Sequence, residues 1–411
     1  MMRPHRILIA MPLMTMLVML AAPARADVIR DWNSLGDDLA AAVRLPPPPH
    51  ARNQALMHVA MFEAVNAIER RYRPYRLDLR TERNTSTEAA AAVAAHAVLA
   101  ALYPGNRAPV DALLAHTLDQ VPEGPARQRA LLLGRKAAAD LLDLRADDGT
   151  DTLESWRPAT PPGVYIPTVV PVGSTFGSIR PWVLKSASQL RPAPPLALTS
   201  EAWARDLNEI RELGGAVSRT RTAEQTVVAK FWFLNGPRTY DPLIQQVAQM
   251  KRLDLLDSAR MYALASMAAS DAYIAVFDAK YYFNFWRPMT AIRNADQTGN
   301  AATARDAHWL PLGETPMHPE YPCAHCISSA AVAAVLIGLA GDDFPDLTLT
   351  SSTAPGVTRH WKRLSHYREE VSLARIWAGF HYRFSTQVGK DMGRRIGELA
   401  LTTQLLPAVE E

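Results

Sequence analysis

The chain has 411 residues, of which 48% are hydrophobic and 21% are charged, and its formal net charge is +3. This composition excludes an intrinsically disordered chain and is sufficient for a full hydrophobic core. The length allows one large domain or two to three ordinary ones. Alanine and leucine dominate and few segments alternate apolar with polar residues, which favours an all-α protein.

The first residues have the pattern of an export signal. A short basic lead precedes an apolar run over residues 7–20, and Ala24 and Ala26 form a small-residue cleavage site before Asp27. The run is short for a membrane span, so an uncleaved anchor is the weaker interpretation. We therefore expect residues 1–26 to be a signal peptide and the mature protein to be periplasmic or secreted.

Cleavage there would also remove the apparent basicity of the chain. The signal holds three arginines and no acid, so the 44 basic residues fall by three to 41, against 41 acidic ones. A neutral mature protein gives no electrostatic reason to expect nucleic acid as a partner. No later stretch is long and apolar enough for a stable membrane span after processing.

Helical patterns begin early in the mature chain. Apolar and small residues recur at helical spacing over residues 53–72 and 86–104, and two further helices are expected over 109–120 and 125–144. Ser86 is the expected N-cap of the second of these helices. Helices are then expected to resume near Thr199 and to run, with breaks, to about Leu399.

Between these helical regions the sequence changes character. Residues 157–195 are rich in proline but also carry Tyr165, Phe176, Trp182 and Leu184, which a disordered linker would not normally contain. We interpret this stretch as an ordered, irregular crossover. The expected organisation is an N-terminal helical bundle (27–155), a Pro-rich crossover (156–198) and a C-terminal helical bundle (199–411).

Three short segments of the last third carry residues of chemical interest, and the first is KYYFNFWRP. If it is helical, the seven-residue spacing places Lys280 and Arg287 on nearly one face. Pro288 disfavours helix at Arg287, so its guanidinium is expected to project from the helix end. Two cations on a surface helix are the simpler interpretation, but the aromatic neighbours indicate burial.

The second segment, EYPCAHCISSAA, has the pattern of a helix N-terminus. Pro322 precedes small residues and a long apolar run, and free backbone N–H groups at such a terminus bind anions. His325 would lie in the first turn and face the anion. A lone histidine is more often structural, so this segment indicates an anion site only when it is taken together with the other two segments.

The third segment, ARIWAGFHYRFS, contains Arg375 and His381 six residues apart. That spacing puts them on different faces of a continuous helix, so a shared site requires the backbone to deviate, and Gly379 is where it could do so. Ser385 follows His381 by four residues and is expected on the same face. Together the three segments describe a pocket for a tetrahedral oxyanion.

The order and spacing of these residues resemble a known superfamily. The pattern K-x6-R-P, then P-S-G-H, then S-R-x5-H-x3-D characterises type 2 phosphatidic acid phosphatases, bacterial acid phosphatases and vanadium-dependent haloperoxidases. The early helix and the stretch WRPMTAIR look more like the haloperoxidase branch. The resemblance implies an all-α fold of two packed bundles with the anion site in the C-terminal one. The matching positions are Lys280, Arg287, Pro288, Pro322, His325, Arg375 and His381.

The resemblance also implies a role for each residue. His381 would be the nucleophile of a phosphatase or the ligand of vanadate in a haloperoxidase, and His325 the general acid or base. Lys280, Arg287 and Arg375 would bind the equatorial oxygens. Cys323 and Ala324 occupy oxyanion-binding positions of the pattern.

Four positions depart from the superfamily pattern. Cys323 replaces serine and a thiol is the weaker hydrogen-bond donor, whereas Ala324 replaces a freer glycine. Ala374 replaces serine before the arginine. Ser385 replaces aspartate, which removes a carboxylate that could orient His381.

The two cysteines admit several interpretations. A haem site would need histidine directly after Cys326, where Ile327 stands, and zinc would need further ligands that have no evident pair. Thioredoxin-like chemistry expects a βαβ context that is missing. A local disulfide between Cys323 and Cys326 stays open.

The leading functional hypothesis is a vanadium-dependent haloperoxidase-like enzyme that oxidises halide with hydrogen peroxide and uses vanadate as cofactor. An acid phosphatase working through a phosphohistidine, without cofactor, is the first alternative. An oxyanion-binding protein with degraded catalysis and a thiol–disulfide protein are the others. The expected partners are small molecules, either halide and peroxide or a phosphate ester, and a homodimer is left open.

Overall fold

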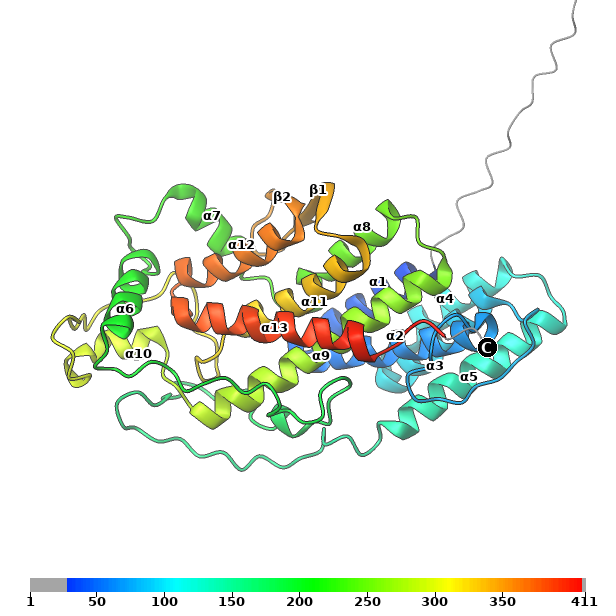
Figure 1. Ribbon diagram of the computed structural model, residues 1–411, viewed down its shortest axis with the longest axis horizontal. Coiled ribbons are helices and arrows are strands. Elements are labelled where there is room, and N and C mark those ends of the chain that lie inside the picture. Colours follow the sequence, from blue (N-terminus) through cyan, green and yellow to red (C-terminus); the bar gives the residue numbers. More distant parts are fainter. Residues whose placement is uncertain (1–27, 409–411) are drawn as a thin grey trace, which may run out of the picture.

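The computed structural model describes residues 28–408 and has a mostly helical, elongated fold (Figure 1). The all-α class expected from the sequence is confirmed. The expected signal peptide lies outside the described residues. The helices are α1 (Val28–Ala42), α2 (Pro47–Glu69), α3 (Thr87–Leu102), α4 (Arg107–Asp119), α5 (Pro125–Leu144), α6 (Glu201–Leu213), α7 (Ala223–Phe231), α8 (Asp241–Met250), α9 (Leu255–Phe283), α10 (Pro288–Arg293), α11 (Ala324–Ala340), α12 (Leu364–Trp377) and α13 (Arg383–Thr403).

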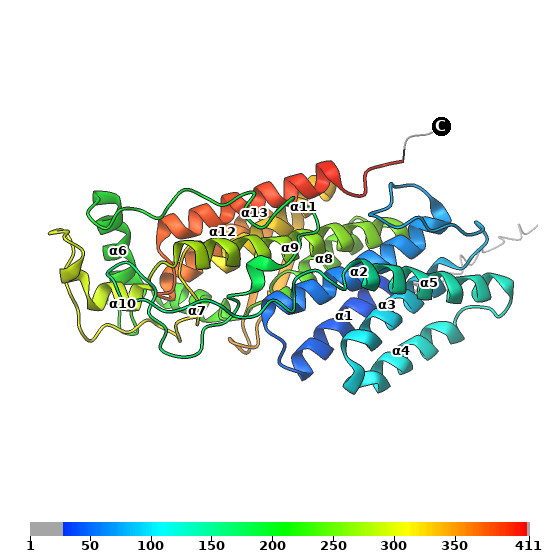
Figure 2. The same ribbon diagram turned by 90° about the horizontal axis from the view of Figure 1, so that it is seen from below.

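The N-terminal helices α1 to α5 gather at one end of the molecule, and α6 and α10 lie at the other (Figures 1 and 2). Helix α2 begins six residues before the expected position because its first turn accepts consecutive prolines, which lack the N–H groups that a first turn leaves unpaired. Ser86 caps α3 as expected and accepts from Ala89 N. Helix α1 was not predicted.

Residues 145–200 connect the two sets of helices without regular structure apart from the short 3₁₀ turn Phe176–Ser178. The buried carboxylate of Asp271 on α9 accepts hydrogen bonds from the backbone N–H groups of Trp182, Val183 and Leu184. This fixes the middle of the segment against α9. One hydrophobic core runs through both sets of helices, so the domain boundaries drawn from the sequence stay a prediction.

A two-stranded antiparallel hairpin interrupts the C-terminal helices. It consists of β1 (Asp343–Thr350) and β2 (Thr358–Arg363), with Leu347 opposite Trp361. The expectation of helices with breaks as far as Leu399 is therefore wrong for this stretch. The alternation in LTLT is too short to have indicated a strand among long helical patterns.

The packing of α13 on α11 sets the geometry of the site. Three glycines of α13, four residues apart, face backbone carbonyls of α11: a Cβ at Gly389 would lie 2.7 Å from Cys323 O, and one at Gly393 would lie 2.2 Å from Ile327 O. Gly397 makes the same approach to Ala331 O. The first turn of α11 and the start of α13 are consequently held in direct contact.

Among the described residues no single helix has both the length and the apolar composition to cross a membrane. The bent pair Thr87–Leu102 and Pro104–Asp119 passes that test only when the two helices are taken together.

Candidate oxyanion site

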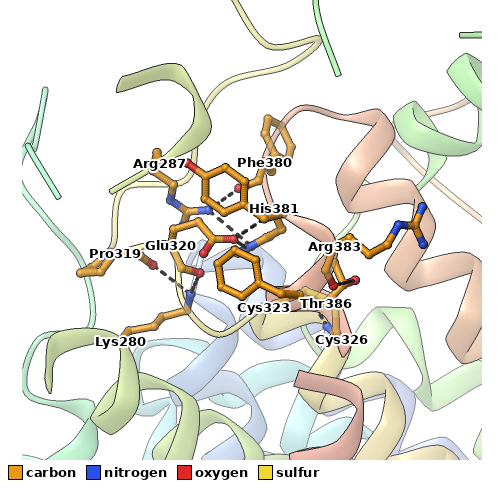
Figure 3. Close-up of polar contacts among 12 residues, drawn as sticks. Lys280, Arg287, Pro319, Glu320, Cys323, Cys326, Phe380, His381, Arg383 and Thr386 are labelled. Carbon is orange, nitrogen blue, oxygen red and sulfur yellow. Dashed lines mark hydrogen bonds and ion pairs between the residues drawn. A yellow bond between two sulfur atoms is a disulfide. The ribbon is translucent and has the colours of Figure 1, made fainter. Parts of the chain in front are cut away.

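Lys280 lies in the last turn of α9 and is fully buried. Its Nζ donates to Pro319 O at 2.9 Å and to Glu320 O at 2.7 Å, which ties α9 to the loop before α11 (Figure 3). Burial lowers the pKa of Lys280 well below its usual value, and the nearby Arg287 lowers it further. The ammonium is therefore held where an additional negative group would stabilise it.

Arg287 lies outside α9, as its proline neighbour predicted. Helix α9 ends at Phe283, Asn284 has a left-handed φ of 48°, and Arg287 is the extended N-cap of α10. The expectation that Lys280 and Arg287 share one helical face is wrong, because the chain leaves the helix between them.

The guanidinium of Arg287 is held in place by the two neighbouring loops. Its Nε donates to His318 O at 2.8 Å and its Nη1 donates to Phe380 O at 3.1 Å. Nη1 also lies 3.4 Å from His381 Nε2. Burial lowers the pKa of Arg287 to about 10.

Arg375 and His381 reach the same site because the backbone turns at Gly379, as predicted. Helix α12 ends at Trp377 and Gly379 has φ 81°. Arg375 Nη1 donates to Trp232 O, and its buried Nε has no hydrogen-bond partner among the described residues. Burial and the neighbouring Arg287 lower the pKa of Arg375 to about 9.

Glu320, which the sequence did not single out, contacts His381 directly. Its Oε1 lies 2.7 Å from His381 Nδ1 and also accepts from Tyr382 N at 3.2 Å (Figure 3). Both side chains are buried, and burial raises the pKa of Glu320 to about 7. The sequence, with Ser385 in place of aspartate, led us to expect that His381 has no carboxylate partner. That expectation is therefore wrong. A glutamate just before the PCAH stretch was the available signal.

Ser385 is not on a helical face shared with His381, because His381 precedes the N-cap of α13. Its buried hydroxyl is near enough to Glu320 to lower the pKa of that carboxyl but makes no hydrogen bond of standard geometry within residues 28–408. Ser385, where the superfamily pattern carries aspartate, thus lies next to Glu320.

His325 lies in the first turn of α11, as expected, and Ala324 begins the helix. The imidazole is half-buried, and its Nε2 is 3.0 Å from Leu234 O. A carbonyl oxygen can only accept, so Nε2 carries a proton and the neutral form keeps its lone pair on Nδ1. Burial, and then Arg375, lower the pKa of His325 well below its usual value.

Cys323 and Cys326 form a disulfide, and both are fully buried. This decides the question that the spacing left open. Cys323 has no thiol to donate to an oxyanion, so its expected side-chain role as a weak donor is wrong. Its Sγ instead accepts from Cys326 N at 3.2 Å and caps α11 (Figure 3).

His318 was also missed by the sequence. Its Nδ1 lies 2.9 Å from Arg287 Nη2, and its ring packs edge-on against Phe277. Burial, and then Lys280 and Arg287, lower its pKa well below the usual value. An isolated histidine seven residues before His325 gave no pattern from which to predict this contact.

We call Lys280, Arg287 and Arg375 the cation cluster. They are 0%, 1% and 2% exposed. Among the described residues, the only carboxylate that hydrogen-bonds to His381 is that of Glu320, and no carboxylate hydrogen-bonds to the three cations; Lys280 binds the backbone oxygen of Glu320. Buried charges normally have partners, so three cations with one carboxylate and an unpartnered Arg375 Nε fit a site for an anion.

The donors suit a tetrahedral oxyanion such as phosphate or vanadate. Two guanidiniums and one ammonium can donate to the oxygen atoms of such an anion, and His381 Nε2 offers a lone pair. No group of three or more histidine, cysteine or acidic side chains within residues 28–408 could hold a simple metal cation. The site therefore fits an anionic oxo group rather than a bare cation.

Comparisons with known proteins find similarity over the part of the chain that holds this site. Residues 260–406 match the family described as the VCPO second helical-bundle domain. Vanadium chloroperoxidase of Curvularia inaequalis is 25% identical in an alignment over 245 residues, and the match covers 44% of this chain and 40% of that protein. The chain thus spans less than half the length of that curated relative.

Solved structures resemble the chain over more of its length. The crystal structure of the first bacterial vanadium-dependent iodoperoxidase matches with a TM-score of 0.79 and 23% identity, covering 93% of this chain and 98% of that one. A holo-type bacterial vanadium-dependent chloroperoxidase matches with a TM-score of 0.68 and 17% identity, covering 86% and 91%. At these identities the likeness establishes the fold.

Proposed function

We propose that this chain, which belongs to the superfamily of vanadium-dependent haloperoxidases and related phosphatases, is a vanadium-dependent haloperoxidase-like enzyme. Its substrates would be a halide and hydrogen peroxide. The proposal rests on the buried cation cluster beside His381. Too few carboxylates lie near the cluster to balance its positive charge.

Each side chain has a role in this proposal. Arg287, Arg375 and Lys280 would hold the oxygens of vanadate, and His381 would ligate it through Nε2, the nitrogen that faces Arg287. When bound, vanadate would supply a Lewis-acidic centre that activates peroxide for attack by halide. His325 Nδ1 would accept or return a proton in the pocket, because Nε2 is already held by Leu234 O.

Phosphomonoester hydrolysis is the second candidate, and one contact favours it. A carboxylate hydrogen-bonded to Nδ1 of a histidine makes the opposite nitrogen a better nucleophile, and Glu320 stands in that position towards His381. The cation cluster would stabilise the charge of the phosphoryl group in transfer. Both chemistries use the same pocket and the same donors.

A parallel assay separates the two. The purified chain is loaded with orthovanadate and tested for oxidation of iodide, bromide and chloride by peroxide, and the vanadate-free chain for hydrolysis of an aryl phosphate. Halide oxidation that requires vanadate and disappears in His381→Ala supports the leading proposal. Hydrolysis that vanadate inhibits would favour the phosphatase. Vanadate binding without either activity would support the oxyanion-binding alternative.

Export to an oxidising compartment belongs to the same proposal. The buried disulfide supports it, because such bonds persist mainly in secreted and periplasmic proteins. Intact-mass measurement on protein from its native host tests it, with a mature chain starting at Asp27 as the expected result. A chain that keeps Met1 would contradict export by cleavage.

A further inference from the structure

We propose that Glu320 is a positioning residue that holds the His381 imidazole with its proton on Nδ1 and its lone pair on Nε2, directed at the bound oxyanion. The carboxylate that the superfamily pattern places four residues after this histidine is here supplied from the loop before α11. This inference rests on the proposed function, in which His381 Nε2 bonds to vanadate.

The geometry assigns the proton. Glu320 Oε1 lies 2.7 Å from His381 Nδ1 and also accepts from Tyr382 N, and an ionised carboxylate can only accept, so Nδ1 is the donor towards ionised Glu320. The opposite nitrogen, Nε2, lies 3.4 Å from Arg287 Nη1, which can only donate. One ring nitrogen therefore faces an acceptor and the other faces a donor, which selects a single neutral tautomer.

The loop that carries Glu320 is itself fixed. Lys280 Nζ binds the backbone oxygens of Pro319 and Glu320, and Glu320 N donates to Phe285 O at 2.8 Å. Its side chain is fully buried and reaches His381 across 61 residues of sequence. The carboxylate cannot turn away to solvent, as a surface glutamate could.

A glutamate beside the cation cluster is unfavourable for anion binding on electrostatic grounds alone. A carboxylate beside an oxyanion site repels the anion, so a protein that only collected phosphate would bind it better without Glu320. The repulsion is offset only if the anion forms a bond to His381, because the carboxylate raises the basicity of Nε2. The repulsion lowers the affinity for an anion, and the greater basicity of Nε2 raises it for an anion that bonds to His381. Comparing an anion that forms this bond with one that does not separates the two effects.

The first experiment compares vanadate with phosphate in Glu320→Gln, which keeps the volume and an acceptor oxygen but removes the charge. Dissociation constants are measured by calorimetry on the whole chain, with Glu314→Gln as control, since Glu314 is exposed in the same loop. We expect vanadate to bind ten- to a hundredfold more weakly and phosphate to bind equally or more tightly. Equal weakening of both anions would overturn the proposal in favour of a structural role.

The second experiment needs no anion and no activity. The ¹⁵N shifts of His381, assigned with His381→Gln, report which ring nitrogen carries the proton in ¹⁵N-histidine-labelled protein. We expect a non-protonated Nε2 in the parent chain and a mixture of tautomers in Glu320→Ala. An unchanged tautomer in Glu320→Ala would overturn the assignment. If the parent chain fails to bind vanadate, the proposed function fails while this measurement still decides the role of Glu320.

A relocation variant completes the test. Ser385 is buried and adjacent to Glu320, so Ser385→Asp in the Glu320→Ala background returns a carboxylate to the position of the superfamily pattern. We expect this double variant to recover the parent tautomer and most of the vanadate affinity. A folded double variant that recovers neither would contradict the exchange of one carboxylate for the other.

Discussion

The backbone N–H of His381 donates to the carbonyl oxygen of Arg375, 3.4 Å away, across the turn that follows α12. Phe380 N donates to the same oxygen at 3.0 Å. A continuous helix would have put the side chains of Arg375 and His381 on different faces. The turn instead places the guanidinium and the imidazole at one site, and it depends on the positive φ of Gly379.

We predict that Gly379→Ala destabilises the protein by about 3–5 kcal/mol and abolishes vanadate binding. A side chain there is strained at φ 81°, and its Cβ would lie 2.4 Å from Gly214 O, a backbone atom that cannot easily move. Urea unfolding monitored by tryptophan fluorescence gives the stability, and calorimetry gives the binding.

Gly356→Ala is the matched control for this prediction. Gly356 has φ 80°, but a Cβ added there would have no atom of the described residues within 4 Å, so the variant carries the backbone strain without the clash. It should lose only about 1–2 kcal/mol and keep anion affinity. Equal losses at the two positions would mean that the close approach of Gly214 does not matter.

We also predict that Arg287→Ala and Arg375→Ala each weaken vanadate and phosphate binding by roughly ten- to a hundredfold. Both guanidiniums are buried in the cation cluster, where a charged hydrogen bond to an anion is strong. Arg293 and Arg383 are the controls, because Arg293 binds Trp309 O and Arg383 pairs with Glu209. Equal effects at all four positions would indicate a diffuse charge effect.

The same cluster predicts that anion binding stabilises the fold. At a hundred times its dissociation constant, phosphate or vanadate should add about 2.7 kcal/mol to the free energy of unfolding. Thermal melts with and without the anion measure this, and the increase should vanish in Arg375→Ala. A melting temperature that does not respond to either anion would show that the buried cations are stable without a ligand.

The sequence singled out Lys280, Arg287, Arg375, His325 and His381 because each lies in a short stretch with a fixed local pattern, and their roles stay predictions. Arg287 outside a helix followed from Pro288, and the turn at Gly379 followed from the six-residue spacing of Arg375 and His381. The contact between Glu320 and His381 could not be predicted, because it joins segments 61 residues apart and depends on how α13 packs on α11. The hairpin β1–β2 was missed because helical patterns surround it.

The disulfide changes what peroxide should do to the site. With Cys323 and Cys326 joined, no thiol adjoins the cluster, and the parent chain should keep its activity under peroxide. Cys326→Ser frees the Cys323 thiol and should make activity decay with exposure to peroxide. Activity after timed incubation, with the sulfur oxidation state read by mass spectrometry, measures this.

Cys323→Ser/Cys326→Ser is the control, since it lacks both the disulfide and the thiol. It should resist peroxide like the parent chain but lose about 2 kcal/mol of stability, the effect of closing so short a loop. A single variant as resistant as the double variant would mean that the freed thiol is not exposed to peroxide.

The last prediction concerns a pair of acids far from the site. Asp241 is buried at the start of α8, and burial, together with the neighbouring Asp37, raises its pKa well above the usual value. The folded state therefore holds a proton that the unfolded state releases above about pH 4. Its stabilising contribution is complete below that pH and is lost as the pH rises through the folded pKa.

Asp241→Asn removes this titration while keeping the shape and a donor towards Asp37. At pH 8 we expect the variant to have a larger free energy of unfolding than the parent chain, by about 1.4 kcal/mol for each unit by which the folded state raises the pKa of Asp241. Urea unfolding measures this difference. The difference should shrink towards pH 4. Asp38→Asn, at an exposed carboxylate paired with Arg238, should leave the pH dependence unchanged.

A parent chain whose stability does not fall between about pH 5 and pH 8 relative to Asp241→Asn would contradict a protonated Asp241. The carboxyl would then be ionised inside the bundle, held by Gln54, whose Nε2 lies 3.4 Å from its Oδ2.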